Sequence, residues 1–187
     1  MRFAHLDERL SLSGFTIWFT GLSGAGKSTI AQLVGPELER RGGPVEYLDG
    51  DVVRTHLSKG LGFSKDDRDT NVERIGWVAS KLTRHGAWTL VSAISPYAAT
   101  RAKVRSMVEA EGAFIEVHVN ASADACADRD VKGLYKKALA GEIPEFTGVS
   151  DPYEAPRNPE LVINTEGESA EASAQRVIAE LEARKLI

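Results

Sequence analysis

The sequence predicts an α/β fold in which a five-stranded parallel sheet has helices on both faces. Two observations lead to this prediction. Short apolar segments alternate along the chain with amphipathic segments of helical length, which is the pattern of repeated strand–helix units. The apolar segments are nearly continuous rather than alternating, as in parallel strands that are covered on both sides. We therefore expect right-handed crossover connections between neighbouring strands.

The elements follow from the apolar spacing and from the Gly and Pro residues that interrupt it. The expected strands are residues 15–20, 45–48, 87–94, 114–119 and 161–164. The expected helices are residues 29–41, a short helix after residue 51, a long helix from about residue 65 to 86, residues 98–109, one or two short helices within 122–142, and residues 169–185. Residues 141–159 hold four of the seven prolines and predict a long ordered loop.

Composition limits the class of protein. The 187 residues, 42% of them hydrophobic, suit one domain, with residues 1–14 as an N-terminal arm and about 128–159 as a lid and substrate loop. The net charge of −4 argues against nucleic acid or a membrane surface as a partner. A single cysteine, Cys126, permits no internal disulfide, and no apolar run reaches the 18 residues of a membrane span. The charged residues 1–9 do not resemble a signal peptide, so we expect a cytoplasmic protein.

A phosphate-binding loop follows the first expected strand. Residues 21–28 read Gly-Leu-Ser-Gly-Ala-Gly-Lys-Ser and fit G-x-x-x-x-G-K-[ST] between a strand and a helix. Gly21, Gly24 and Gly26 allow the backbone N–H groups to turn inward around phosphates, and the next helix directs its positive end at the same place. Lys27 is expected to reach the β- and γ-phosphates and Ser28 to ligate Mg²⁺. The ATP-binding residues predicted here are Gly21, Ser23, Gly24, Ala25, Gly26, Lys27, Ser28 and Thr29.

Further polar side chains follow the later strands, at the edge where open parallel sheets bind ligands. Asp49 and Asp51 follow the second strand, and either carboxylate can orient an acceptor hydroxyl, accept its proton or help to hold Mg²⁺. Asp51 is the better candidate, since Gly50 lets the chain turn toward the phosphates. Asp49 is equally well explained as a helix cap. Ser95 ends the third strand, where most serines only satisfy a turn.

The segment between residues 52 and 75 mixes basic and acidic side chains around a Gly-flanked aromatic residue. Arg54, Arg68 and Asn71 suit an anionic second substrate, although charges on a helix often form only a solvated face. Phe63 can stack on a base or anchor the core. Arg129 and Lys132 fall where a kinase lid contacts ATP. The four histidines are scattered without ligand spacing, so no metal site is expected apart from that of Mg²⁺.

Three classes of P-loop protein can be compared. A GTPase needs an Asn-Lys-x-Asp motif, which is not present. A motor or transporter ATPase normally has a long apolar strand closed by Asp or Asp-Glu, whereas the third strand here ends in Ser95-Pro96 and the fourth in Asn120. A small phosphotransferase with a nucleotide-like acceptor fits both the length and the layout.

Several longer blocks of sequence resemble the adenylylsulfate kinase (adenosine 5′-phosphosulfate kinase) family, over about residues 13–185. Besides the phosphate-binding loop, the matching blocks are residues 48–54, 60–64 with Asp67, Arg68 and Asn71, 94–97, 129–138 and 146–148. The resemblance implies a three-layer P-loop kinase fold and transfer of the ATP γ-phosphoryl group to the 3′-hydroxyl of adenosine 5′-phosphosulfate (APS), giving 3′-phosphoadenosine 5′-phosphosulfate. It also implies a homodimer and a functional link to ATP sulfurylase, to which some members are fused.

The resemblance also implies roles for individual residues. Lys27, Asp51 and Ser95 would be catalytic, with Ser95 matching a serine described as a phosphoenzyme site in this family, and Ser28 and Asp51 would bind Mg²⁺. Phe63 and Phe146 would sandwich the adenine of APS, and Arg129 would hold ATP. The residues expected to bind APS are Asp49, Asp51, Arg54, Phe63, Arg68, Asn71, Ile94, Ser95, Lys132 and Phe146.

The sequence departs from the family pattern at two places. Glu73 replaces a usual arginine after Asn71, and Pro144-Glu145 precede Phe146 where a Lys or Gly-Asn type of pair is common. Both departures make the acceptor region more acidic. A second interpretation therefore stays open, in which the protein is an inactive nucleotide-binding module that regulates a partner sulfurylase. The nearest enzymatic alternative is another small P-loop kinase.

Overall fold

Five parallel strands form one sheet in the order β2-β3-β1-β4-β5 in a computed structural model that describes residues 14–130 and 133–187. The strands are β1 (Phe15–Thr20), β2 (Val45–Asp49), β3 (Trp88–Ser92), β4 (Ala113–Asn120) and β5 (Leu161–Asn164). Each strand pairs in parallel with its neighbours. The predicted five-stranded parallel sheet is therefore confirmed.

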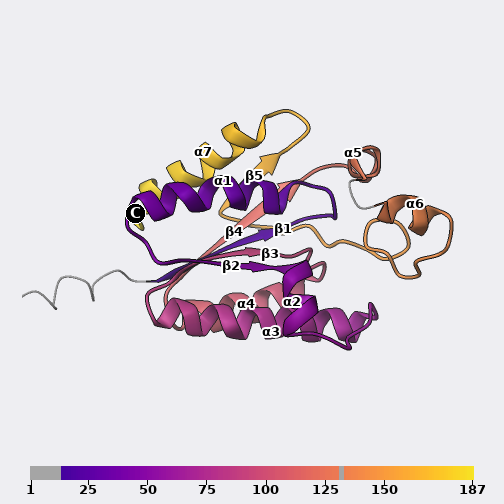
Figure 1. Ribbon diagram of the computed structural model, residues 1–187, viewed down its shortest axis with the longest axis horizontal. Helices are drawn as coiled ribbons and strands as arrows, with labels where there is room; N and C mark the ends of the chain where they lie inside the picture. The colour runs from indigo at the N-terminus through magenta and orange to yellow at the C-terminus, as the bar shows by residue number, and fades with distance from the viewer. Residues whose placement is uncertain (1–13, 131–132) are drawn as a thin grey trace, which may run out of the picture.

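Helices cover both faces of this sheet. Helices α1 (Lys27–Arg40) and α7 (Ala170–Ala183) lie together on one face, and α3 (Lys65–Arg84) and α4 (Ala98–Glu109) lie together on the other (Figure 1). The three shorter helices are α2 (Gly50–His56), α5 (Ala123–Arg129) and α6 (Leu134–Leu139). The predicted three layers are confirmed, and the described part of residues 122–142 contains two short helices, where one or two were expected.

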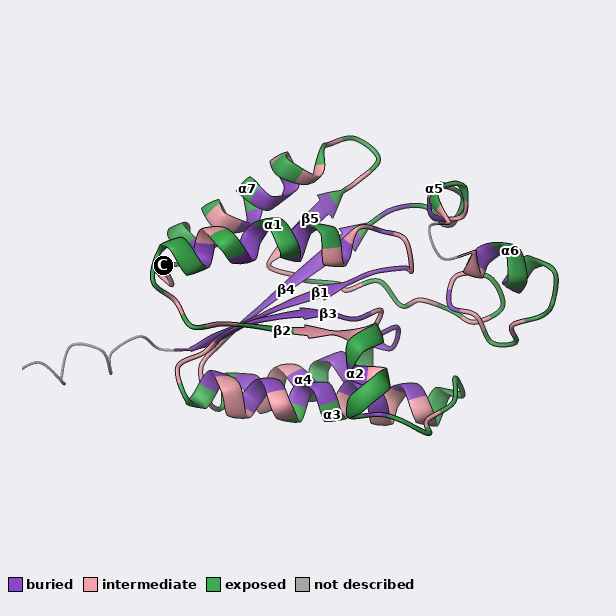
Figure 2. Cartoon of the chain, viewed as in Figure 1, coloured by how far each residue is buried: buried purple, intermediate pink, exposed green. Residues whose placement is uncertain are grey.

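The central strand β1 divides the core into two parts. All six of its residues are buried, as the continuous apolar pattern predicts. Because side chains alternate along a strand, Phe15, Ile17 and Phe19 pack with α1 and α7, whereas Trp18 packs with α3 and α4. Figure 2 shows the result, with buried strands between helices whose outer faces are exposed. The phosphate-binding loop thus begins at the end of the most enclosed strand.

Some boundaries differ from the sequence prediction. Strand β3 ends at Ser92 rather than residue 94, because the chain then turns toward Ser95, which has the left-handed backbone angle φ 42°. Leu33 is an apolar residue of α1, yet it is 39% exposed. The loop predicted for residues 141–159 contains no helix or strand in the structure. Of the expected arm only Gly14 is described, and it is buried; residues 1–13 lie outside the described residues.

The carboxyl ends of all five strands lie along one edge. In Figure 1 the arrowheads point to the right, toward α5, α6 and the loop of residues 141–159. Every polar cluster identified at a strand end therefore reaches the same side of the molecule.

None of the helices in residues 14–130 and 133–187 combines the length and the apolar character of a membrane-spanning segment.

Candidate active site

The loop after β1 has the backbone that phosphate binding requires. Gly21, Gly24 and Gly26 have φ angles of 149°, 78° and 106°, a region that side chains with a Cβ rarely adopt. Gly21 also passes so close to β4 that a Cβ would lie 2.3 Å from the carbonyl oxygen of Val119. Gly26 caps α1, so the positive end of that helix opens directly onto the loop.

The two residues that end the motif are already oriented by polar contacts. The Lys27 ammonium is buried against the loop and donates to the carbonyl oxygens of Gly21 at 3.0 Å and Leu22 at 2.7 Å. The Ser28 hydroxyl donates to Oδ2 of Asp49 at 2.5 Å. The end of β2 is thereby joined to the first turn of α1.

Asp49 has two structural partners. Its other oxygen, Oδ1, accepts the backbone N–H of Asp51 at 2.9 Å and so caps the N-terminus of α2. The sequence leaves the role of Asp49 open between a cap and a functional carboxylate, and the structure places it as the cap and against Ser28 at once. Asp51 follows in the first turn of α2 and is exposed.

Three side chains from distant parts of the chain brace the phosphate-binding loop. Arg129, at the end of α5, donates to the Gly24 carbonyl at 3.4 Å and to Thr165. Thr165, after β5, donates to the carbonyl of Ala25 at 3.0 Å. The Tyr135 hydroxyl donates to the carbonyl of Ser23 at 3.1 Å. Arg129 therefore lies beside the loop, and its contact with ATP stays a prediction; Thr165 and Tyr135 were not identified from the sequence.

Arg54 and Arg68, which were predicted to bind an anionic second substrate, each contact other side chains of the predicted site or the long loop. We call the surroundings of these two arginines the acceptor region. The Arg54 guanidinium lies over the exposed Phe63 ring, 4.6 Å from its centroid, and donates to the Gly62 carbonyl at 3.0 Å. Arg68 is 7% exposed, donates to Thr147 at 2.8 Å and forms an ion pair with Asp151. Burial, followed by the charge of Arg68, lowers the pKa of Arg54.

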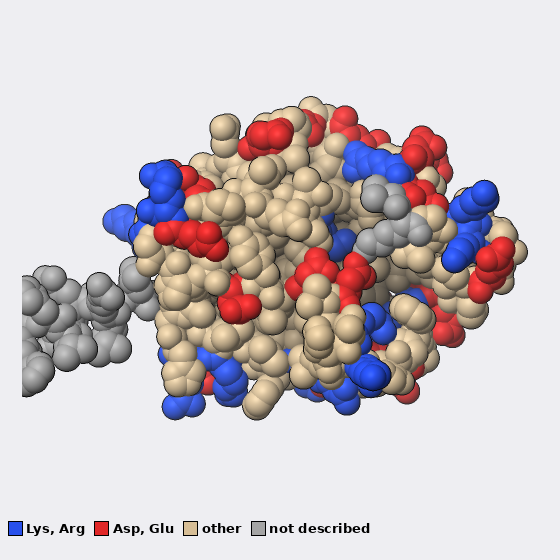
Figure 3. Space-filling view, in the orientation of Figure 1, with Lys and Arg blue, Asp and Glu red and all other residues tan. Residues whose placement is uncertain are grey.

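Asn71 and Phe146 complete this region. Asn71 is 6% exposed, and among the described residues its Oδ1 has no hydrogen-bond partner, which is unusual for a buried oxygen. Phe146 is half-buried and meets the Tyr135 ring edge to face, with centroids 5.0 Å apart. Figure 3 shows acidic and basic side chains adjoining around a hollow on the right half of the molecule, where the carboxyl edge lies.

Ser95 is buried rather than open to the site. Its side chain accepts the Trp18 indole N–H at 3.0 Å and donates to Thr20 at 3.0 Å, and only 2% of the residue is exposed. Ile94 beside it is half-buried, and its carbonyl accepts the Thr20 hydroxyl at 2.7 Å. In this arrangement Ser95 joins the end of β3 to β1, and a catalytic role for it stays a prediction.

The remaining predicted residues are placed as follows. Thr29 is exposed in the first turn of α1, and Lys132 lies outside the described residues. Glu73, the acidic departure, forms an ion pair with Lys103 of α4 at 2.7 Å. The negative charge of Glu73 is therefore partly offset by α4. Glu145 is exposed in a turn with φ 53° that leads into Phe146.

A parallel sheet in the order β2-β3-β1-β4-β5, with a phosphate-binding loop after the central strand, defines the class of P-loop kinases. The family can be stated more narrowly. The model of the Adenylylsulphate kinase family matches residues 13–164, and the chain belongs to this family.

Individual relatives agree with this assignment. An adenylyl-sulfate kinase of Gloeothece citriformis is 56% identical over 90% of this chain and 94% of its own length. The Mycobacterium tuberculosis APS kinase CysC, solved in complex with AMPPNP and APS, has a TM-score of 0.87 and 46% identity over 91% of this chain and 98% of that one. A Sorangium cellulosum protein named "Probable bifunctional SAT/APS kinase 2" is 56% identical over 91% of this chain, which spans 29% of that relative.

Proposed function

We propose that this site transfers the γ-phosphoryl group of ATP to the 3′-hydroxyl of APS, giving 3′-phosphoadenosine 5′-phosphosulfate and ADP. The observation that carries the proposal is the position of these groups at one edge of the sheet. Asp49 contacts the end of the phosphate-binding loop, and Arg54 and Arg68 lie in the helices that follow β2. The bond from the γ-phosphorus to the β-phosphate oxygen breaks, and a bond to the 3′-oxygen forms. The proton of the 3′-hydroxyl passes to the carboxylate of Asp51.

ATP is held by the loop and the residues that brace it. The inward N–H groups of residues 21–28 and the positive end of α1 bind the phosphates, and Lys27 exchanges its loop carbonyls for phosphate oxygens. Arg129 keeps the loop against β5 through Gly24 and Thr165. This contact with the loop supports the expected role of Arg129 in holding ATP.

The residues present fit Mg²⁺. A serine hydroxyl and a carboxylate in contact are hard oxygen ligands, and Mg²⁺ usually takes one or two such protein ligands together with phosphate oxygens. Ser28 and Asp49 would hold the ion, with Asp51 as the second carboxylate predicted for it. When bound, Mg²⁺ neutralises the charge that develops on the phosphate oxygens.

APS is recognised by the acceptor region. Arg54 and Arg68 supply positive charge for the phosphosulfate group, since a guanidinium presents paired donors to paired oxygens. Phe63, with 57% of its surface exposed, and the half-buried Phe146 are the aromatic surfaces available to stack on adenine. The unpartnered Oδ1 of Asn71 provides a buried acceptor for a substrate N–H or O–H group. Ile94 and Lys132 stay predicted contacts of the same substrate.

The test is ADP release by the purified chain with a panel of acceptors. We expect turnover that requires Mg²⁺ and APS and that is absent with AMP or gluconate. Gluconate is included because a Sinorhizobium meliloti gluconokinase shares the fold at 18% identity and a TM-score of 0.58. Turnover with AMP or gluconate but not APS would overturn the proposed acceptor, and absence of turnover with all three would favour the inactive regulatory module.

We also propose a homodimer, as the resemblance implies. Light scattering should give twice the 20.3 kDa mass of one chain, whereas a mass of 20.3 kDa would contradict the proposal.

The Sorangium cellulosum relative, named as a bifunctional SAT/APS kinase, supports the expected functional link to ATP sulfurylase.

A further inference from the structure

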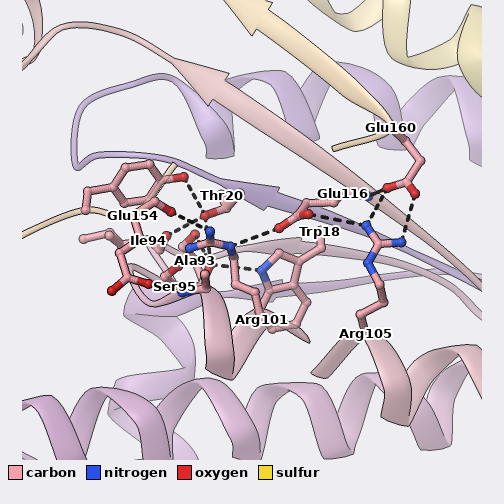
Figure 4. A network of polar contacts seen from close by, with 12 residues as sticks. Trp18, Thr20, Ala93, Ile94, Ser95, Arg101, Arg105, Glu116, Glu154 and Glu160 are labelled. Carbon is pink, nitrogen blue, oxygen red and sulfur yellow. Dashed lines mark hydrogen bonds and ion pairs between the residues drawn. The ribbon is translucent and has the colours of Figure 1, made fainter. Parts of the chain in front are cut away.

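Arg101 of α4 is a buried arginine that holds three separate segments of the chain. Its side chain is 4% exposed and points toward the sheet (Figure 4). Nε donates to Oε1 of Glu116 on β4 at 3.0 Å, Nη1 donates to the Ser95 carbonyl at 2.7 Å, and Nη2 donates to the Glu154 carbonyl at 2.5 Å. One rigid group therefore fixes β4, the turn after β3 and the long loop relative to one another.

Stability alone does not account for this arrangement. Burial of both charges costs much of what their attraction returns, so an apolar pair of similar volume is often equally stable. A guanidinium differs from an apolar side chain, and from a lysine, in that its donors have fixed directions in one plane. The geometry that Arg101 imposes on its three partners is thus the property that other residue types would not supply.

The first partner is the turn that carries Ser95. The left-handed φ of 42° is an unfavourable backbone angle for a non-glycine residue, and it persists only where several contacts determine it. Here the hydroxyl of Ser95 is held by Trp18 and Thr20, and its carbonyl is held by Arg101. The turn is thereby fixed from both sides, directly beyond the end of β3.

The second partner is the loop that reaches the acceptor region. Glu154 is attached to residues 96–101 at three points: its N–H donates to the Pro96 carbonyl at 2.9 Å, its side chain accepts the Ala98 N–H at 2.7 Å, and its carbonyl accepts from Arg101. Three residues earlier, Asp151 of the same loop pairs with Arg68. A change in the position of Glu154 would therefore also move Asp151 and with it Arg68, which is proposed to bind APS.

We propose that Arg101 is a positioning residue for the acceptor site, which sets the long loop against the turn after β3 so that Arg68 and Phe146 are aligned for APS. This inference rests on the proposed function. On the ATP side, the described braces of the phosphate-binding loop are Arg129, Thr165 and Tyr135, and Arg101 donates to none of them in the hydrogen bonds above.

The test compares Arg101→Lys with the matched control Arg105→Lys. Lysine keeps the charge but loses the planar fork. Arg105 lies one turn further along α4 and pairs with Glu160 and, at 3.4 Å, with Oε2 of Glu116, without reaching the carbonyls of Ser95 or Glu154. For Arg101→Lys we expect the KM for APS to rise about tenfold or more, with the Kd of an ATP analogue within about twofold of the parent value. For Arg105→Lys both constants should stay near the parent values.

Two further measurements test the inference. One uses a variant that keeps the buried ion pair, so that poor folding cannot explain its result, and the other needs no substrate. Glu154→Ala removes an exposed side chain and leaves the buried pair intact, and it should raise the KM for APS about threefold or more. Hydrogen exchange should accelerate about tenfold at residues 146–156 in Arg101→Lys but not in Arg105→Lys. An unchanged exchange rate, an unchanged KM in both test variants, or an equal loss of ATP and APS binding would overturn the inference. Failure of the parent protein to use APS would instead overturn the proposed function.

Discussion

The hydroxyl of Ser28 and the carboxylate of Asp49 lie 2.5 Å apart, although 21 residues separate them in the chain. The contact joins the first turn of α1, which follows the phosphate-binding loop, to the carboxyl end of β2. It is formed by the same carboxylate that caps α2, and in the proposed reaction this pair of oxygen ligands would hold Mg²⁺.

The two roles of Asp49 can be separated by two substitutions. Asp49→Asn keeps a good helix cap, so we expect unfolding stability to stay near that of the parent, whereas Asp49→Ala should lose about 1 kcal/mol. Both variants lack the carboxylate and should need about 10- to 100-fold more Mg²⁺ for half-maximal turnover. Magnesium titration of the rate and urea unfolding measure the two effects. An unaltered magnesium requirement in Asp49→Asn would exclude Asp49 as a ligand.

Asp51→Ala is expected to abolish most turnover while leaving nucleotide affinity within a few-fold of the parent value. The reason is that a general base contributes about 10²- to 10⁴-fold to the rate and little to the binding of ATP. The measurements are kcat and the Kd of an ATP analogue. An equal loss of both would show that Asp51 serves the ATP side, and Asp51→Asn controls for the loss of side-chain volume.

Ser95→Ala tests whether the serine carries a phosphoryl group. Because direct in-line transfer needs no phosphoserine, we expect kcat to fall by less than about tenfold. Stability should fall by about 1–3 kcal/mol, since the buried Trp18 indole loses its acceptor. A loss of activity as complete as that in Asp51→Ala, with the fold intact, would indicate an obligatory phosphoenzyme.

Stability should decrease as the pH falls below neutrality, in part because of His118. This residue is 9% exposed and stacks on Tyr153, and burial, followed by the charge of Arg101, lowers the pKa of its imidazole. The unfolded chain therefore binds more protons between the folded pKa and the ordinary value near 6.5. His118→Gln should flatten the loss of unfolding free energy between about pH 7 and 5. The exposed His56 provides the control substitution, and a profile that His118→Gln leaves unchanged would contradict this explanation.

Local sequence was sufficient for most of the framework. The bounds of β1, β5 and α4 agree with their apolar patterns, and the glycines of the phosphate-binding loop have the positive φ angles that their spacing predicted. These features depend on residues that are neighbours in the chain. The fold class and the nucleotide-binding edge were predictable for that reason.

Contacts between distant segments were not predictable in the same way. The braces Thr165 and Tyr135 lie 140 and 112 residues from their partners in the loop, and neither has a local signal. Arg101 does have a local sequence signal. It shares the buried face of α4 with Val104 and Val108, and a charged residue on such a face requires buried partners. The double role of Asp49 depends on the direction of one side chain, which the pattern Asp-Gly-Asp leaves open.

In the proposed reaction, phosphate passes from ATP directly to the 3′-oxygen of APS. A single-turnover reaction with ATP labelled at the γ-phosphate, followed by separation of nucleotides and protein, tests it most directly. We expect the label to appear in the 3′-phosphate of the product at the rate at which ADP forms, with none on the protein. Label on Ser95 before product forms, or label released as inorganic phosphate while APS stays unmodified, would contradict it.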